Sequence, residues 1–137
     1  MTTEEKVLVK KSWAILRQID PVILGDVFYS RLFLIAPEVQ RLFKSPQQEQ
    51  ARKLVDTLSY VIARLDTLES VAADVAALAR RHAAYGVQVW HYELVGNALI
   101  WTLKQGMGAD WSPALEQAWV ACYHTLSTVM IQSVHAD

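Results

Sequence analysis

One histidine stands where its side chain could carry chemistry. In the stretch RRHAAYGVQVWHY, residues 80–92, His82 follows an Ala-rich apolar run and precedes a glycine. One face of a predicted helix carries, on successive turns, Val71, Val75, Leu78 and His82. We therefore expect the imidazole to face the interior, where it could bind a metal or exchange protons. The alternative is an ordinary core histidine whose nitrogens are satisfied by neighbouring groups.

Beyond this histidine, the sequence lacks the common motifs of catalytic and metal sites. It contains no Gly-rich phosphate loop, no Cys or His pair at metal-finger spacing and no Gly-x-Ser-x-Gly elbow. The remaining histidines, His91, His124 and His135, form no i, i+4 pair on one helix, and acidic residues do not cluster with them. This pattern argues against a mononuclear zinc or a di-iron site.

The composition predicts a single domain, residues 1–137, with a substantial core. Hydrophobic residues make up 53% of the chain. Thirteen Lys and Arg against fourteen Asp and Glu give a formal charge of −1, so we expect no nucleic-acid partner. No apolar run is long enough to cross a bilayer, so we expect no membrane partner. The lone Cys122 and the absence of a signal-peptide pattern favour a cytoplasmic protein.

Helical periodicity predicts an all-α domain of six or seven helices. The Thr2–Glu5 capping box begins a helix that runs to about residue 19, and Asp20 followed by Pro21 begins the next. We expect Pro37 to end or turn that second helix. The expected buried stripes are Leu8, Ser12, Ile15 and Ile19; Leu24, Phe28, Leu32 and Ile35; Ala51, Leu54, Leu58, Ile62 and Leu65; and Leu115, Trp119, Cys122, Leu126 and Val129.

The remaining segments complete this helical pattern. Gly86 should end the helix that carries His82 from just beyond its last residue. Two further helices are expected at 91–107 and 114–135. Residues 87–90 alternate as a strand would, but the segment is too short to change the class of the fold.

Four stretches give the sequence a resemblance to the globin family. They are FYSRLFLIAPEVQRLF, QEQARKL, LARRHAAYGV and HYELVG. Together they are similar to bacterial single-domain globins and to the haem domain of flavohaemoglobins, and the third also resembles neuroglobin. The resemblance spans almost the whole chain. It implies a globin fold of six to eight helices around a haem pocket.

The resemblance also implies a role for particular residues. His82 would be the proximal ligand of the haem iron, and Phe43 would stack on the porphyrin. The absence of a Cys-x-x-Cys-His attachment motif indicates haem b. Tyr29 and Gln50 would line the distal side, where a gas binds. Further contacts with the haem are expected from Leu54, Leu78, Val87, Tyr92 and Lys53. Gly25 and Ala51 match the small residues at which two globin helices cross closely.

The residue types suit these roles. A neutral imidazole is a good axial ligand, and as the only protein ligand it leaves the sixth iron position open. Gln50 and Leu54 lie one helical turn apart and can face the same ligand. A buried phenol such as Tyr29 needs a hydrogen-bond partner, and bound dioxygen is one. Plainer alternatives remain: a backbone carbonyl partner for Tyr29, a solvated Gln50, a surface Lys53, and ordinary core packing for Leu78 and Val87.

The sequence departs from the flavohaemoglobin pattern at three places. In that group a tyrosine, matched here by Tyr92, and a glutamate polarise the proximal histidine, but Val134 stands at the glutamate position and no acid follows before Asp137. No reductase segment follows the helices, so we expect no built-in electron source. Gln50 replaces the distal histidine of many animal globins and is a poor iron ligand, so we do not expect six-coordination through it.

Three functions remain open at this stage. The first is reversible binding of dioxygen, and of carbon monoxide or nitric oxide, for storage, delivery or scavenging. The second is a nitric oxide dioxygenase that depends on a separate reductase. The third is a non-haem sensor or partner-binding domain that keeps the helical architecture without the cofactor.

Overall fold

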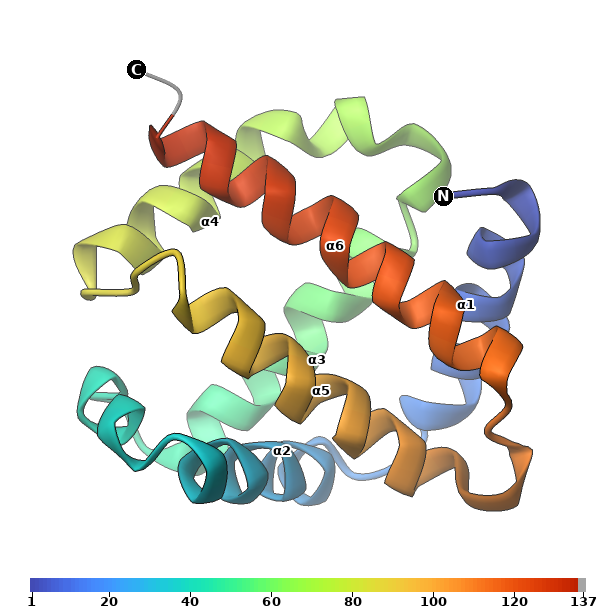
Figure 1. Ribbon diagram of the computed structural model, residues 1–137, viewed down its shortest axis with the longest axis horizontal. Helices are drawn as coiled ribbons and strands as arrows, with labels where there is room; N and C mark the ends of the chain where they lie inside the picture. The colour runs from blue at the N-terminus through green and yellow to red at the C-terminus, as the bar shows by residue number, and fades with distance from the viewer. Residues whose placement is uncertain (136–137) are drawn as a thin grey trace.

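The computed structural model describes residues 1–135, and these residues form an all-α fold (Figure 1). The α-helices are α1 (Thr3–Leu16), α2 (Pro21–Ile35), α3 (Gln47–Ile62), α4 (Ala72–Ala84), α5 (His91–Met107) and α6 (Pro113–His135). Three short 3-10 helices connect them: η1 (Pro37–Leu42), η2 (Leu65–Val71) and η3 (Gly108–Asp110). The predicted all-α class is confirmed, and the described residues contain no strand.

The start signals predicted for the first two helices are confirmed. The Thr2 hydroxyl accepts a hydrogen bond from the Glu5 amide at 3.1 Å, and the Glu5 carboxylate accepts one from the Thr2 amide at 2.8 Å. Asp20 caps α2 by accepting from the Val22 amide at 2.9 Å. The expected end of the first helix near residue 19 is wrong, because α1 stops at Leu16 and a tighter turn follows.

The corners after α2 and α4 also follow the sequence. The second helix ends at Ile35, and Pro37 begins η1 instead of continuing α2. Gly86 ends α4 with a φ of 97°, in the left-handed region that glycine adopts without strain. The strand-like residues 87–90 form a turn before α5. Within residues 1–135, no helix combines the length and apolarity that crossing a bilayer requires.

Two tryptophans join the outer helices at the centre of the core. The rings of Trp13 on α1 and Trp119 on α6 meet edge to face, with their centroids 6.1 Å apart. The Trp119 indole donates to the Ser12 hydroxyl at 2.9 Å, and the Trp13 indole donates to the Ser59 hydroxyl of α3 at 3.0 Å. Each buried indole therefore has a partner, and α1 is held against both α3 and α6.

Some residues of the expected stripes lie outside this core. Ile15 is 55% exposed, because α1 is rotated so that its buried face carries Val9, Trp13 and Leu16. The other three members of the expected stripe do face inward, because Ser12 is buried and Leu8 and Ile19 are half-buried against the core. Ile35, the last residue of α2, and Val129 of α6 are also exposed.

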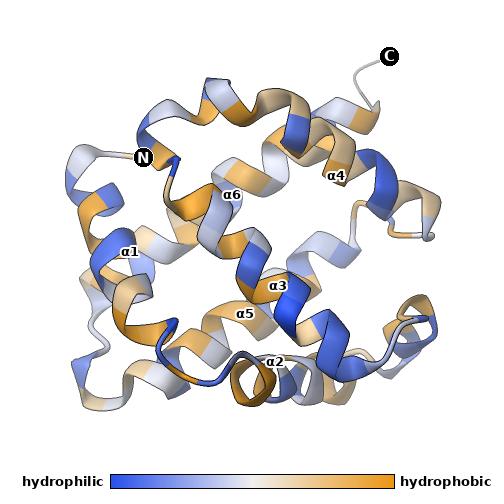
Figure 2. Ribbon diagram, turned by 180° about the vertical axis from the view of Figure 1, so that it is seen from behind, coloured by the Kyte–Doolittle hydropathy of each residue, from blue (hydrophilic) through white to orange (hydrophobic). Residues whose placement is uncertain are grey.

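The six α-helices pack in crossed pairs. Helix α2 packs on α3 and α5, while α6 packs on α1 and α4 (Figure 1). Seen from behind, α3 shows hydrophilic segments beside hydrophobic ones along its length, as expected for a helix with a single buried face (Figure 2). Helices α2 and α3 therefore form one side of the molecule, and α4 and α6 another.

The crossing of α2 and α3 is unusually close. A Cβ atom at Gly25 would lie 2.2 Å from the Cβ atom of Ala51, far inside van der Waals contact. The prediction that these small residues permit a close approach is therefore confirmed. The crossing brings Tyr29, one turn beyond Gly25, next to Gln50, the neighbour of Ala51 in the chain.

Replacing Gly25 by alanine should destabilise the fold. Glycine to alanine inside a helix normally stabilises by about 1 kcal/mol. Here the added methyl group must push α3 away, and we expect a net loss of about 1–3 kcal/mol in the free energy of unfolding. Urea unfolding measures it, with Ser30→Ala at an exposed position of α2 as the matched control. Equal or greater stability of Gly25→Ala would mean that the helices are farther apart than described.

Candidate functional site

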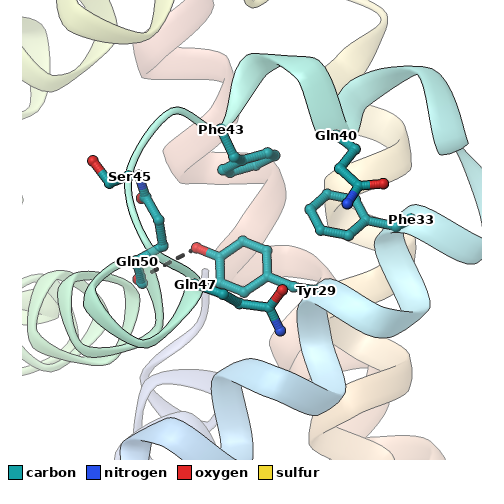
Figure 3. A pocket seen from close by; sticks show the side chains of 7 residues that line it. All are labelled: Tyr29, Phe33, Gln40, Phe43, Ser45, Gln47 and Gln50. Carbon is teal, nitrogen blue, oxygen red and sulfur yellow. Dashed lines mark hydrogen bonds between the residues drawn. The ribbon is translucent and has the colours of Figure 1, made fainter.

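A cavity of about 200 Å³ lies where α2, η1 and α3 meet (Figure 3). Three of its lining residues are among those that the resemblance implies: Tyr29 and Gln50, expected on the distal side, and Phe43, expected to stack on the porphyrin. Sequence reasoning missed the other lining residues, which are Phe33, Gln40, Ser45 and Gln47. Phe33 carried a usable signal, because it follows Tyr29 by one helical turn on α2.

Aromatic contacts fix the ring of Tyr29 at the inner end of this cavity. The Phe43 ring meets it edge to face at 5.2 Å between centroids, and the Phe28 ring does so at 4.9 Å. Phe33 lies stacked at 6.0 Å and also contacts Phe43. A ring held from three sides has one direction for its hydroxyl group, and in Figure 3 that direction is toward Gln50.

The Tyr29 hydroxyl is buried and available as a donor. The residue is 4% exposed, and burial raises its pKa to about 12, so the phenol stays protonated at neutral pH. The hydroxyl donates to the backbone carbonyl of Gln50 at 3.3 Å. This is the plainer partner considered for Tyr29. The distance is long for an O–H···O bond, which usually measures about 2.7–2.8 Å, so the contact is weak.

Gln50 and Leu54 share one face of α3, and Lys53 lies on its exposed side. Gln50 is half-buried at the cavity, and Leu54, one turn later, is half-buried against the core. Lys53 is exposed, and its Nζ atom lies 3.3 Å from the Glu49 carboxylate in an i, i+4 pair. Lys53 is therefore a surface residue in this structure, as the plainer alternative predicts. A contact between Lys53 and a haem propionate stays a prediction.

The hydrogen bond of His82 defines its tautomer. The imidazole is half-buried near the end of α4, and its Nδ1 atom lies 2.8 Å from the backbone carbonyl of Leu78. A carbonyl oxygen can only accept, so Nδ1 must carry the hydrogen. The neutral ring then has its lone pair on Nε2. A metal-binding histidine usually donates the hydrogen of one ring nitrogen to a carbonyl or carboxylate. The other ring nitrogen is then free to coordinate the metal.

His91 has the opposite arrangement. Its Nδ1 atom accepts from the Gln88 amide at 2.7 Å, so in the neutral ring the hydrogen lies on Nε2 and no lone pair remains free. Burial lowers the pKa of His91, and the nearby charge of Arg41 lowers it further, which keeps the ring neutral. The ring also contacts Trp90, with centroids 3.9 Å apart. His91 therefore closes the turn before α5.

A second cavity, of about 250 Å³, lies between α3 and α4. The lining residues are Asp56, Thr57, Tyr60, Val61, Asp74, Val75, Leu78 and Arg81. Leu78 is thus a wall residue, as expected, and it lies one turn before His82. The Tyr60 hydroxyl bridges the two helices by donating to the Asp74 carboxylate at 2.8 Å. Space therefore remains between the helix of Gln50 and the helix of His82.

The start of α5 is held by a tyrosine that sequence reasoning missed. The Tyr123 hydroxyl donates to the backbone carbonyl of Tyr92 at 2.6 Å. Its ring lies over Gly96, where a Cβ atom would approach within 2.6 Å. The sequence signal for this contact is Gly96, four residues after Tyr92, because a glycine leaves room for a ring to pack on the helix. Burial raises the pKa of both tyrosines above the ordinary value, which keeps the phenols neutral.

The last residues predicted for the site are Val87 and Tyr92, together with Val134 at the position of the flavohaemoglobin glutamate. Val87 and Tyr92 are both half-buried, just after the helix of His82. Val134 is half-buried on α6, so the described chain supplies no carboxylate at that position, and Asp137 lies outside the described residues. No group of three or more His, Cys, Asp or Glu side chains that could hold a metal occurs in residues 1–135.

Comparisons with known proteins agree on one family. The Globin family profile matches residues 26–130. The chain is 29% identical to the flavohemoprotein of Vibrio cholerae over 134 residues, which cover 96% of this chain and 34% of that protein. The match therefore spans about a third of that longer protein. The neuroglobin of Tetraodon nigroviridis is 28% identical over 144 residues, covering 95% of this chain and 90% of that protein.

Two solved structures share the arrangement of helices. One is an engineered carbene transferase from Rhodothermus marinus, RmaNOD, described as a candidate nitric oxide dioxygenase. It matches with a TM-score of 0.85 at 27% identity, covering 100% of this chain and 99% of that one. The other is a bacterial globin from Campylobacter jejuni, with a TM-score of 0.83 at 27% identity, covering 96% of this chain and 95% of that one.

Proposed function

The chain belongs to the globin family, and from this premise we propose that it holds haem b through His82 and binds diatomic gases near Tyr29 and Gln50. The observation that carries the proposal is the contact between His82 Nδ1 and the Leu78 carbonyl, at 2.8 Å. It leaves the lone pair of the imidazole on Nε2, the nitrogen that can coordinate iron.

The surroundings of His82 fit an iron porphyrin. Apolar walls would come from Leu54 and Leu78, an aromatic face from Phe43, and further contacts from Val87 and Tyr92. Lys53 would have to leave Glu49 to reach a propionate. When bound, haem supplies an iron atom with one coordination position open to a gas.

The distal residues favour a polar gas. The Tyr29 phenol is protonated and buried, and Gln50 lies beside it, so two donors can face one ligand. Dioxygen, which becomes partly negative when bound, gains from such donors, whereas carbon monoxide gains little. We therefore favour reversible dioxygen binding for storage, delivery or scavenging, with carbon monoxide and nitric oxide as further ligands. We also propose the cytoplasmic location expected from the sequence, where the single buried thiol of Cys122 would stay reduced.

Absorption spectra of the purified protein test the haem proposal. We expect a Soret band in the ferric, ferrous and carbon-monoxide forms. We also expect a single broad visible band in the ferrous form, because Gln50 does not coordinate iron and the haem stays five-coordinate. A protein without a Soret band would be a non-haem helical domain, the third function considered. Sharp, split visible bands in the ferrous form would mean that a second side chain reaches the iron.

The second candidate is a nitric oxide dioxygenase that works with a separate reductase. The similarity to RmaNOD and to the Vibrio flavohemoprotein favours it. Val134 weakens it, because the chain places no carboxylate there to polarise His82. Sustained conversion of nitric oxide to nitrate in the presence of a flavin reductase would establish this activity. A single turnover that stops at ferric protein, with or without the reductase, would leave reversible binding as the function.

A further inference from the structure

We propose that gases reach the Tyr29 hydroxyl through a mouth between Gln40 and Gln47, and that Gln47, held by Asp26, is the gate of this route. The inference rests on the proposed function, because it concerns how a gas reaches that site. It assigns a role to two residues, Gln47 and Asp26, that have no part in holding haem or in contacting the bound gas.

The residues that line the 200 Å³ cavity range from exposed glutamines at its mouth to the buried Tyr29 at its inner end. Gln40 and Gln47 are exposed, Ser45 and Phe43 are half-buried, and Tyr29 is 4% exposed. The cavity therefore connects solvent to the phenol. Its outer rim consists of amides, and its inner end consists of aromatic rings (Figure 3). A volume of this size leaves ample room for a diatomic molecule.

A single hydrogen bond closes the side of this mouth. The Gln47 amide on α3 donates to the Asp26 carboxylate on α2, so the side chain bridges the two helices. Asp26 lies three residues before Tyr29, and Figure 3 shows Gln47 alongside the Tyr29 ring. Both bonded residues are exposed, and exposed side chains change rotamer within nanoseconds. The bridge can therefore open and close quickly without any change in the helices.

The start of α3 adds freedom at the same point. Gln47 is the first residue of α3, and Pro46 before it provides no side-chain cap. Helices α1 and α2 both begin with such a cap. The first turn of α3 therefore begins without a side-chain cap, so the bond between Gln47 and Asp26 can open without breaking one.

Carbon monoxide recombination after flash photolysis tests the route. In Gln47→Trp the indole should block the mouth, and both association and dissociation should slow about tenfold, because access falls with the fraction of time the route is open. A gate changes both rates equally and leaves the affinity unchanged. Gln48→Trp is the matched control, since Gln48 is exposed on the same turn but does not line the cavity. Asp26→Ala should raise both rates, and Asp26→Asn, which keeps an acceptor for Gln47, should restore them.

A second measurement is independent of iron chemistry. In protein reconstituted with zinc protoporphyrin, dissolved dioxygen quenches the triplet state, and the quenching rate reports access of gas to the pocket. We expect Gln47→Trp to lower this rate by the same factor as carbon monoxide association, and Gln48→Trp to leave it unchanged.

The outcomes separate the route from the proposed function. A wild-type protein without a Soret band would overturn both. A normal spectrum with unchanged gas rates in Gln47→Trp would overturn the route alone. Faster loss of haem in Gln47→Trp but not in Gln48→Trp would mean that Gln47 helps to hold haem. That result would also overturn the proposed route.

Discussion

Replacing His82 by glycine should abolish tight retention of haem. The substitution removes the Nε2 lone pair that the hydrogen bond between His82 Nδ1 and the Leu78 carbonyl leaves free. His91 has its Nδ1 atom committed to the Gln88 amide. We expect purified His82→Gly to carry little haem, measured as the ratio of Soret to protein absorbance. Added imidazole should restore a Soret band, because free ligand can occupy the space that the side chain leaves.

Two control variants separate ligation from damage to the helix. His124→Gly introduces glycine at an exposed position of α6, with a similar helical cost of about 1 kcal/mol, and should keep its haem. His91→Gln removes the other buried imidazole and should also keep it. Normal haem content and unchanged spectra in His82→Gly would show that the assignment of the ligand is wrong. Loss of haem in His91→Gln alone would make His91 the ligand instead.

The fold was largely accessible from local sequence signals. Each helix start that the capping rules predicted is present, because a cap depends only on residues within one turn, as at Thr2 and Asp20. The extent of a buried face is less local. Periodicity predicts that Ile15 is buried with Ser12, yet Ile15 is exposed, because the helices that pack on α1 cover only part of the predicted stripe. Sequence periodicity does not specify where that cover ends.

The residues of the candidate site also fall into two groups, those that sequence motifs predict and those that only the packing of the helices brings in. Tyr29, Phe43 and Gln50 could be expected together because their motifs resemble those of a known family, and the fold does bring them to one cavity. Gln47 has no local signal, and Tyr123 has only the glycine at Gly96, since each acts through a partner distant in sequence: Asp26 for the first and the Tyr92 carbonyl for the second. Such pairings depend on helix crossing, which periodicity does not specify.

Replacing Tyr29 by phenylalanine should accelerate the release of dioxygen about tenfold or more. A hydrogen bond to a partly charged ligand in a dry pocket contributes on the order of 1.5 to 3 kcal/mol, and about 1.4 kcal/mol corresponds to one decade in rate. The ring and its contacts with Phe28, Phe33 and Phe43 remain, so the packing is preserved. Carbon monoxide release should change little. Stopped-flow replacement of each gas measures the two rates.

The controls for Tyr29 use the other donor and another phenol. Gln50→Leu should act in the same direction but more weakly, and the double variant should be non-additive, because both donors share one ligand. Tyr60→Phe removes a hydroxyl bonded to Asp74 outside this cavity and should leave dioxygen release unchanged. Because burial raises the pKa of Tyr29 to about 12, the phenol stays protonated, and its titration should add no pH dependence to dioxygen release at any pH well below 12.

The contact between Tyr29 and the Gln50 carbonyl makes this experiment decisive. At 3.3 Å the bond is weak, so we expect the hydroxyl to leave it when a better acceptor binds. If dioxygen release is unchanged in Tyr29→Phe, the hydroxyl stays on the carbonyl, and slow release loses its main support. Faster oxidation to ferric protein with unchanged release would give the phenol a different task. It would then exclude water and protons from the cavity, and the selectivity for dioxygen would have to come from Gln50.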